Sequence, residues 1–236
     1  MLTSSDIVGL LVSYAYAIGL LVAGEGLRRF AGVPPHVTRK LIHIGAGMWV
    51  FGVLALFSRW QVGVVPFASF IVVNALLYRY RAVGAMDSED SSHGTIYFAA
   101  AIALLFAVFW RPEGPVDRLL PAVCGVMALT WGDALAALIG RRFGRHRYTI
   151  FGSNRSWEGS AVMLGVSALA VLLTLLLLPG SALAPLAPPV GPGRATLAAL
   201  VAALVGTAVE GGSPHGSDNL TVPLAVAAAV AFVTMA

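Results

Sequence analysis

The feature that most constrains this chain is the recurrence of long apolar runs along its whole length. Several of them approach the roughly 20 residues that a helix needs to cross a hydrocarbon core about 30 Å thick. Only 11% of the residues are charged, against about 25% in an average soluble domain. The mean hydropathy of +0.84 agrees with this. The composition excludes a soluble globular domain and a disordered chain, and it predicts an all-α, polytopic transmembrane bundle.

Eight apolar segments are separated by short polar or Pro/Gly-rich connections. The last two are short for spanning helices, and 195–209 consists mostly of Ala, Val and Gly. There is no fixed-period repeat, so we expect one integral-membrane domain over residues 1–236. The segments are 7–24, 41–57, 61–78, 93–110, 119–140, 157–178, 195–209 and 220–236.

The distribution of Lys and Arg sets the expected orientation. If the N-terminus lies outside, the inside connections hold eleven of the 15 Lys and Arg residues and the outside connections hold four. Basic residues accumulate in cytoplasmic loops, so we place the N-terminus outside and the protein in the inner membrane of the cell. Most polar motifs then lie inside, which predicts a site open to the cytoplasm. The basic residues fall in short clusters between apolar runs, which argues against nucleic-acid binding.

One carboxylate, Asp133, stands inside an apolar segment, seven residues before Gly140. A charge at that depth is costly unless it is paired, protonated or bound to a cation. We favour a metal or substrate role, and the alternative is a structural hydrogen bond to a neighbouring helix. Small residues around it, including Gly132, favour close helix packing.

The basic connection after this segment leads into the polar stretch 151–159. Its glycine, hydroxyl and amide groups can contact phosphate oxygens at the start of the next helix. A guanidinium in the stretch adds a bidentate donor. Glu158 either holds a cation or offsets the positive end of the helix. The predicted phosphate-binding residues here are Ser153, Asn154, Arg155, Ser156 and Glu158.

Two further sets of polar residues lie in connections or helix ends that are predicted to face the inside. Glu210, Asp218 and Asn219 flank one short turn, and their oxygen atoms are of the kind that Mg²⁺ prefers. The alternative is a solvated turn that caps the last helix. Arg39, Lys40 and His43 share one helical face, where they either contact substrate or anchor the helix at the interface.

Five motifs, in order along the chain, resemble those of the CTP-dependent polyprenol kinases, which include the dolichol, phytol and farnesol kinases. The phytol kinase branch is the most similar. The resemblance runs from about Arg39 to Pro223. The motifs are Arg39–His43, Ser92–Phe98, Gly132–Ala136, Ser153–Gly159 and Asp218–Pro223.

The resemblance implies a membrane enzyme that moves the terminal phosphate of CTP, with a divalent cation, onto a long-chain isoprenoid alcohol. Together with the residue chemistry it implies that Mg²⁺ is held by Asp133, Glu210 and Asp218. Lys40 and His43 are then expected near the transferring phosphoryl group or the alcohol, and His43 and Asp133 are both candidates to accept the hydroxyl proton. Arg39, Asn219 and the 153–158 residues are expected near the nucleotide phosphates, while the isoprenoid tail stays in the bilayer between helices.

One departure and two alternatives accompany this interpretation. Arg155 stands where the family usually has lysine, which keeps the charge but changes the geometry. The Gly-Asp and Trp-Glu-Gly motifs are shared with CDP-diacylglycerol synthases, which are cytidylyltransferases, but the later Lys-Asp and His-Gly-Gly elements of that family are missing here. A transporter is the other alternative, although no second buried charge continues an ion path through the outer half of the segments.

Overall fold

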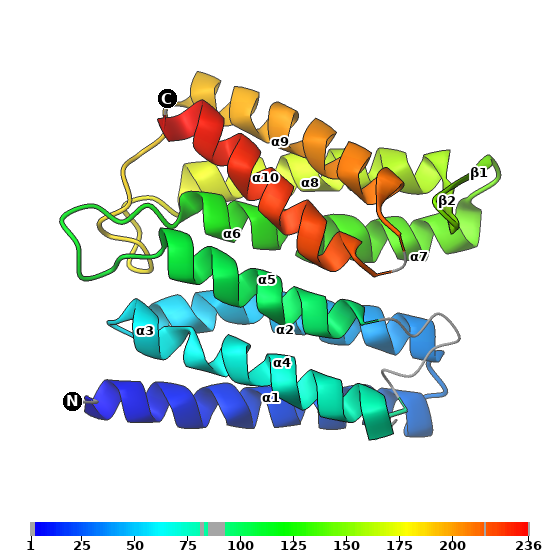
Figure 1. The fold of residues 1–236 in the computed structure, drawn as a ribbon, viewed down its shortest axis with the longest axis horizontal. Coiled ribbons are helices and arrows are strands. Elements are labelled where there is room, and N and C mark those ends of the chain that lie inside the picture. Colours follow the sequence, from blue (N-terminus) through cyan, green and yellow to red (C-terminus); the bar gives the residue numbers. More distant parts are fainter. Residues whose placement is uncertain (1–2, 81–82, 85–92, 215, 236) are drawn as a thin grey trace.

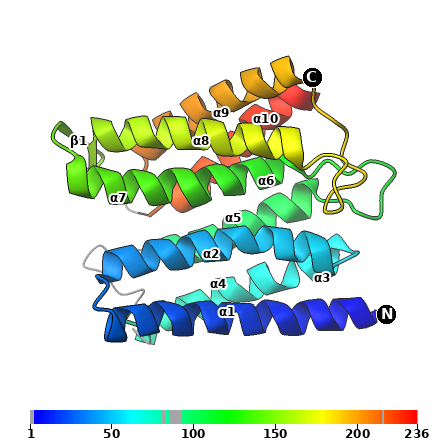
Figure 2. The same cartoon turned by 180° about the vertical axis from the view of Figure 1, so that it is seen from behind.

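The computed structural model describes residues 3–80, 83–84, 93–214 and 216–235. It consists of long helices that run side by side, with a small β-hairpin at one end of the bundle (Figures 1 and 2). The elements are α1 (Ser4–Phe30), α2 (Pro35–Leu56), α3 (Trp60–Gly63), α4 (Val65–Tyr80), α5 (Gly94–Phe109), α6 (Leu120–Met127), the π-helical turn η1 (Ala128–Asp133), α7 (Ala134–Phe143), β1 (Arg147–Ile150), β2 (Ser153–Ser156), α8 (Trp157–Leu177), α9 (Pro192–Gly212) and α10 (Asp218–Met235).

All eight predicted apolar segments form helices, which confirms the all-α polytopic bundle. Within the described ranges, seven helices are long and apolar enough to cross a membrane, counting α3 with α4 and α6 with η1 and α7. The expectation that 195–209 is a short segment was wrong, because α9 has 21 residues. It starts at Pro192, a residue suited to the first turn of a helix, and continues to Gly212. Among the described residues, the predicted segment whose helix is shorter than a typical span is instead α5, with 16 residues.

Local sequence signals explain where several helices begin. Thr3 caps α1: its Oγ1 accepts a hydrogen bond from the Asp6 N–H at 3.2 Å, and the Asp6 carboxylate accepts one from the Thr3 N–H at 2.9 Å. Proline lies in the first turn of α2, α6 and α9, where its missing N–H costs no helical hydrogen bond. Ser156 caps α8 by accepting a hydrogen bond from the Gly159 N–H.

The continuous helix formed by α6, η1 and α7 lies at the centre of the bundle. In Figures 1 and 2, α8, α9 and α10 lie on one side of it, and α1, α2, α4 and α5 lie on the other. Most side chains of α6 and η1 are fully buried, and they form the middle of the hydrophobic core. The N-terminal half packs against this helix mainly through α2 and α5. These two helices therefore determine which side chains of the N-terminal half lie next to the central helix.

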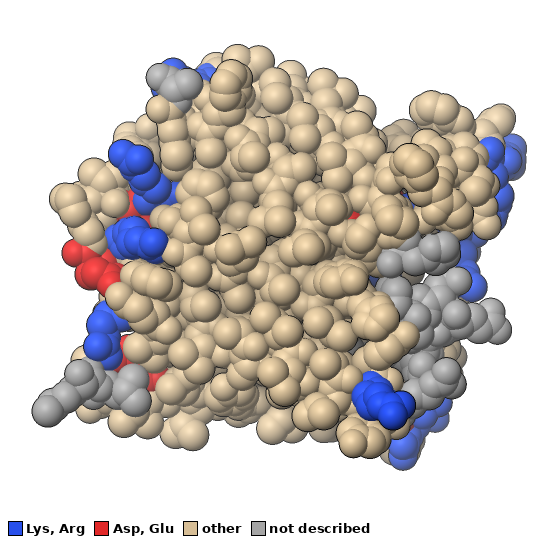
Figure 3. Space-filling view, viewed as in Figure 1, with Lys and Arg blue, Asp and Glu red and all other residues tan. Residues whose placement is uncertain are grey.

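Charged side chains gather at the two ends of the bundle. On the face seen in Figure 3, Lys, Arg, Asp and Glu are found almost entirely at the two edges, with a broad uncharged band between them. We call the edge that carries β1 and β2 the hairpin end and the opposite edge the N-terminal end. At the N-terminal end Arg59 pairs with Asp6, and the backbone N–H of Arg111 donates a hydrogen bond to the Asp117 carboxylate at 2.9 Å. Burial raises the pKa of Asp117.

The excess of basic residues at the hairpin end predicts that this end faces the cytoplasm. A cysteine replacing Thr149, on β1, is expected to react with a membrane-impermeant thiol reagent from the cytoplasmic side. A cysteine replacing Val116, which is exposed at the N-terminal end, is expected to react only from the opposite side. The single native cysteine, Cys124, is fully buried, so the unmodified protein serves as the low-background control. Labelling of both positions from one side would contradict this topology.

Candidate active site

The connection after α7 folds back as the β1–β2 hairpin, which the sequence analysis did not predict. The strands pair antiparallel, with Tyr148 opposite Arg155. Phe151 and Gly152 form the turn, both with positive φ (47° and 79°), as a two-residue hairpin turn requires. The aromatic and β-branched residues before this Gly were the available sequence signal. The hairpin holds Arg155 over the ends of α9 and α10, where acidic residues lie.

Three carboxylates from distant parts of the chain meet at the hairpin end. Asp133 closes η1, Glu210 lies in the last turn of α9, and Asp218 begins α10. One oxygen from each lies within 4.8 Å of the other two. Their residues are only 2%, 4% and 5% exposed. We call Asp133, Glu210 and Asp218 the acidic cluster.

The π-helical turn determines how Asp133 reaches this cluster. Six residues, Ala128–Asp133, depart from α-helical spacing in an otherwise continuous helix, and such π-turns are frequent at functional sites. Two glycines allow neighbouring helices to approach it. A Cβ on Gly132 would lie 2.2 Å from Ser167 Oγ of α8, and one on Gly47 of α2 would lie 1.9 Å from Thr130 Oγ1. The helix continues to Phe143, so Asp133 lies roughly 15 Å from the helix end, against roughly 10 Å for the end expected at Gly140.

Lys40 and His43 of α2 both face Asp133. Lys40 Nζ donates to Asp133 Oδ2 at 2.6 Å, and His43 Nε2 lies 3.8 Å from the same oxygen. This His43 nitrogen is buried and has no hydrogen-bond partner among the described residues. The close approach of Gly47 to η1, one helical turn along α2, explains why these two side chains reach so far into the bundle.

Arg155 joins the other two carboxylates. Its Nη1 lies 2.6 Å from Glu210 Oε1, and its Nη2 donates to Asp218 Oδ2 at 2.8 Å. Burial alone lowers the pKa of the guanidinium, but the Glu210 and Asp218 carboxylates outweigh burial, so the pKa of Arg155 is raised. Arg155 therefore remains charged and bridges β2, α9 and α10.

The acidic cluster has the donor set for a divalent cation. Three buried carboxylates are contacted by two cationic side chains, Lys40 and Arg155, so one negative charge is left over when His43 is neutral. Carboxylate oxygens from a few residues, completed by substrate phosphates, are the usual way in which proteins hold Mg²⁺. The residues therefore fit the predicted ion in number, chemistry and mutual distance.

Two of the predicted phosphate-binding residues have structural contacts here. Ser153 Oγ donates to the Ser213 backbone carbonyl at 3.1 Å, which ties β2 to the connection between α9 and α10. Ser156 caps α8 through the Gly159 N–H at 3.1 Å. Both serines are buried, and these contacts position the hairpin that carries Arg155.

Two others make contacts outside the acidic cluster, Asn154 from β2 and Glu158 from the first turn of α8. Asn154 is exposed, and its Oδ1 accepts a hydrogen bond from Thr149 Oγ1 at 2.7 Å. Glu158 lies 2.7 Å from His146 Nδ1 and accepts hydrogen bonds from the His146 backbone N–H. Of the five residues predicted from this stretch, the structure brings only Arg155 into the acidic cluster.

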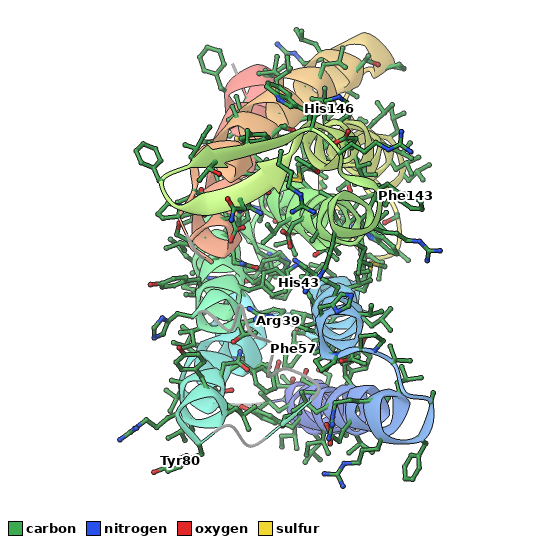
Figure 4. All side chains as sticks on the ribbon, turned by 90° about the vertical axis from the view of Figure 1, so that its right-hand side faces the viewer. Arg39, His43, Phe57, Tyr80, Phe143 and His146 are labelled. Carbon is green, nitrogen blue, oxygen red and sulfur yellow. The ribbon has the colours of Figure 1, made fainter. Side chains whose placement is uncertain are left out.

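An apolar groove leads to the cluster from the N-terminal half, with a volume of about 1030 Å³ when the open solvent at its mouth is included. Helices α1, α2, α4 and α5 form its walls, and Figure 4 shows Arg39 and His43 in the space between α2 and the α4–α5 pair. The polar lining toward the cluster comprises Arg39, Lys40, His43 and Asn219, the last of which directly follows Asp218.

The structure describes one predicted motif only in part and adds residues that were not predicted. Ser92, which opens the 92–98 motif, lies outside the described residues. Phe98 of that motif packs against His43, with ring centroids 4.3 Å apart. Tyr16 and Trp49 also line the groove, and sequence reasoning missed them because they resemble any other apolar helix positions.

Comparison with known proteins decides the family. The phytol kinase of Synechocystis sp. is 36% identical over 220 residues, which cover 92% of this chain and 87% of that protein. The chain belongs to the phytol kinase family. Probable chloroplastic phytol kinases of Triticum aestivum and Glycine max are 28% and 29% identical, over 63% and 64% of this chain and 52% and 51% of their own lengths. No family model and no solved structure matches the sequence.

Membership of the phytol kinase family confirms the resemblance drawn from the five motifs. It makes the protein a kinase that phosphorylates an alcohol and argues against the transporter alternative. The individual site residues remain predictions, which substitutions test directly.

Replacing Asp133 with Asn tests the acidic cluster. The change keeps the side-chain shape and removes the charge that pairs with Lys40, so we expect a folded protein whose phosphorylation of an isoprenoid alcohol falls by at least about a hundredfold. Asp117→Asn is the matched control, since Asp117 is also buried but lies at the N-terminal end. Equal activity of the two variants in a phosphorylation assay would show that Asp133 has only a structural role.

Substitution of Arg155 tests the bridge to α9 and α10. Arg155→Ala leaves Glu210 and Asp218 without their contacting cation, a loss worth about 3–5 kcal/mol for buried pairs. We expect a lower melting temperature in detergent and little activity, whereas Arg155→Lys keeps the charge and partial activity. Arg147→Ala, on the exposed side of the facing strand, is expected to change neither. A fully active Arg155→Ala variant would show that the bridge is dispensable.

Proposed function

We propose that this protein phosphorylates a membrane-embedded isoprenoid alcohol, with CTP as phosphoryl donor and Mg²⁺ at the acidic cluster. One observation carries the proposal: the apolar groove ends at Lys40 and His43, the same side chains that face Asp133. An apolar tail and a hydroxyl group on one substrate match the two ends of this groove. The relatives reported above are named as phytol kinases, and phytol is a molecule of this kind.

The alcohol enters with its hydroxyl group toward Lys40 and His43. The buried Nε2 of His43 has no hydrogen-bond partner among the described residues, so it is available to accept a hydrogen bond from the hydroxyl. His43 is therefore favoured over Asp133 as the group that receives the hydroxyl proton, because the Asp133 oxygen already accepts from Lys40. The tail lies against apolar walls from α1, α2, α4 and α5.

The phosphates bind on the other side of Lys40, between α2, the hairpin and the start of α10. Mg²⁺ held by Asp133, Glu210 and Asp218 would neutralise charge on the phosphate oxygens. Lys40 and Arg155 supply positive charge at both sides of the cluster. Arg39 and Asn219, which line the polar end of the groove, complete the expected set of phosphate contacts.

The proposed reaction forms one bond and breaks one bond. The alcohol oxygen attacks the terminal phosphorus of CTP, and the bond from that phosphorus to the bridging oxygen breaks. The products are the isoprenoid monophosphate and CDP, and His43 takes the hydroxyl proton. Catalysis of this kind consists largely of positioning and charge neutralisation, which agrees with a site built from paired charges rather than from a strong nucleophile.

The proposed cellular setting follows from the same site. CTP is a cytoplasmic nucleotide, so the acidic cluster at the hairpin end faces the cytoplasm and the bundle lies in the inner membrane. The basic last turn of α7, with Arg142, and the connection to β1, with Arg145, suit contact with anionic lipid at that surface.

The main competing reaction is that of a CDP-diacylglycerol synthase-like cytidylyltransferase. Such an enzyme attacks the innermost phosphorus of CTP, leaves CMP on the lipid and releases pyrophosphate. The 210–223 region has no Lys-Asp or His-Gly-Gly element, and the relatives reported above are kinases. Both observations favour the kinase.

Labelled nucleotide separates the two reactions. With purified protein, Mg²⁺ and phytol, CTP labelled at the terminal phosphate is expected to transfer its label to the lipid fraction. CTP labelled at the innermost phosphate is expected to leave the lipid unlabelled, and ATP or UTP is expected to support a lower rate than CTP. Chelation of Mg²⁺ and the Asp133→Asn variant serve as controls without transfer. Incorporation of the innermost phosphate, with phosphatidic acid as acceptor, would contradict the proposal.

A further inference from the structure

The apolar groove has a closed floor, formed where α1 and α2 cross-link through polar and aromatic contacts. Trp49 Nε1 donates to Ser13 Oγ at 3.1 Å, and Ser13 Oγ in turn donates to the Gly9 carbonyl at 2.7 Å. The Tyr16 ring stacks on Trp49 with centroids 4.2 Å apart, and the Tyr16 hydroxyl donates to the Gly45 carbonyl at 2.8 Å. These contacts fix the indole ring across the groove.

Behind this floor the bundle is filled. Phe57, at the end of α2, is 4% exposed, and a Cβ on Gly9 would lie only 2.7 Å from its ring. Val50 and Val53 are fully buried beside it. Figure 4, which looks from the hairpin end, shows Phe57 between the same helices as Arg39 and His43. Among the described residues, a tail that reaches Trp49 therefore meets packed side chains toward the N-terminal end.

The depth of the groove is set by α2. Lys40 at the polar end and Trp49 at the floor both line it, nine residues apart along one helix. At 1.5 Å per residue this is roughly 13–14 Å, less than half of a hydrocarbon core of about 30 Å. A tail longer than this distance must fold back or leave sideways between helices, at the cost of contacts with the walls.

We infer that Trp49, held in place by Ser13 and Tyr16, limits the length of isoprenoid tail that the enzyme accepts, and is a specificity-determining residue for the alcohol. The inference rests on the proposed function, since it assigns the groove to the alcohol. Ala46 lies almost one helical turn from Trp49 on α2 and also lines the groove. A larger side chain at position 46 shortens the groove, and a smaller residue at position 49 lengthens it.

The test measures kcat/KM for a ladder of alcohols that differ only in tail length: geraniol, farnesol, geranylgeraniol and geranylfarnesol. Trp49→Ala is expected to raise the kcat/KM ratio of geranylfarnesol to farnesol by about tenfold, and Ala46→Leu to lower it by about tenfold, because even one methylene in an apolar pocket can change kcat/KM by about tenfold. Trp60→Ala is the matched control, because Trp60 lies at the N-terminal end outside the groove lining. Its ratio is expected to equal that of the unmodified protein.

A binding measurement that does not depend on turnover accompanies the kinetics. A farnesol analogue with a photoreactive diazirine at the far end of the tail is expected to cross-link to residues near Trp49 and Ser13, located by mass spectrometry. Trp49→Phe, which keeps the aromatic ring, is expected to retain this cross-link if Trp49→Ala does not fold. Cross-links on lipid-facing residues such as Phe232, which is 76% exposed, would overturn the inference.

The outcomes separate the inference from the proposed function. If the unmodified protein phosphorylates none of the alcohols, the proposed function fails, and the site of cross-linking alone decides whether the groove holds the tail. If it phosphorylates them but the ratios of Trp49→Ala, Ala46→Leu and Trp60→Ala are equal, the floor does not select length and the inference is wrong. Opposite shifts for Trp49→Ala and Ala46→Leu support it.

Discussion

The structure depends on the compensation of the three buried carboxylates of the acidic cluster, which lie next to a largely apolar core. A charge in such surroundings is costly unless it is paired, and the pairing here is done by Lys40 and Arg155. Lys40 joins α2 to η1, so it links the two halves of the bundle through Asp133. Arg155 joins the hairpin to the ends of α9 and α10. The side chains needed for charge balance are therefore also the ones that bring the groove, the hairpin and the acidic cluster together.

The acidic cluster could be predicted from the sequence because its members contrast with their surroundings. Asp133 in an apolar segment, Glu210 and Asp218 around one turn, and Lys40 beside His43 are each unusual in a chain with 11% charged residues. The groove could not be predicted in the same way. Trp49 and the other wall residues are apolar positions on apolar helices, and only packing separates those that face the groove from those that face lipid.

Two local departures from regular structure also escaped prediction, and both shape the site. The π-turn depends on how α2 and α8 pack against η1 through Gly47 and Gly132, which is information from distant parts of the chain. The hairpin replaces an expected helix-entry loop, so Asn154 points outward and Arg155 inward. In a continuous phosphate loop over 151–159, neighbouring side chains could all contact the phosphates. In a strand, successive side chains point to opposite faces.

The arrangement also addresses the competition between alcohol and water as phosphoryl acceptors. Water is far more abundant, so an alcohol kinase must keep its transferring phosphate away from bulk solvent. Here the acidic cluster is at most 5% exposed, and the groove reaches it through apolar walls. Under the proposed reaction, the alcohol itself fills the space beside Lys40 and His43, and its tail excludes water from the groove. Selectivity for the lipid acceptor then arises from where Lys40 lies, between an apolar cavity on one side and paired carboxylates on the other.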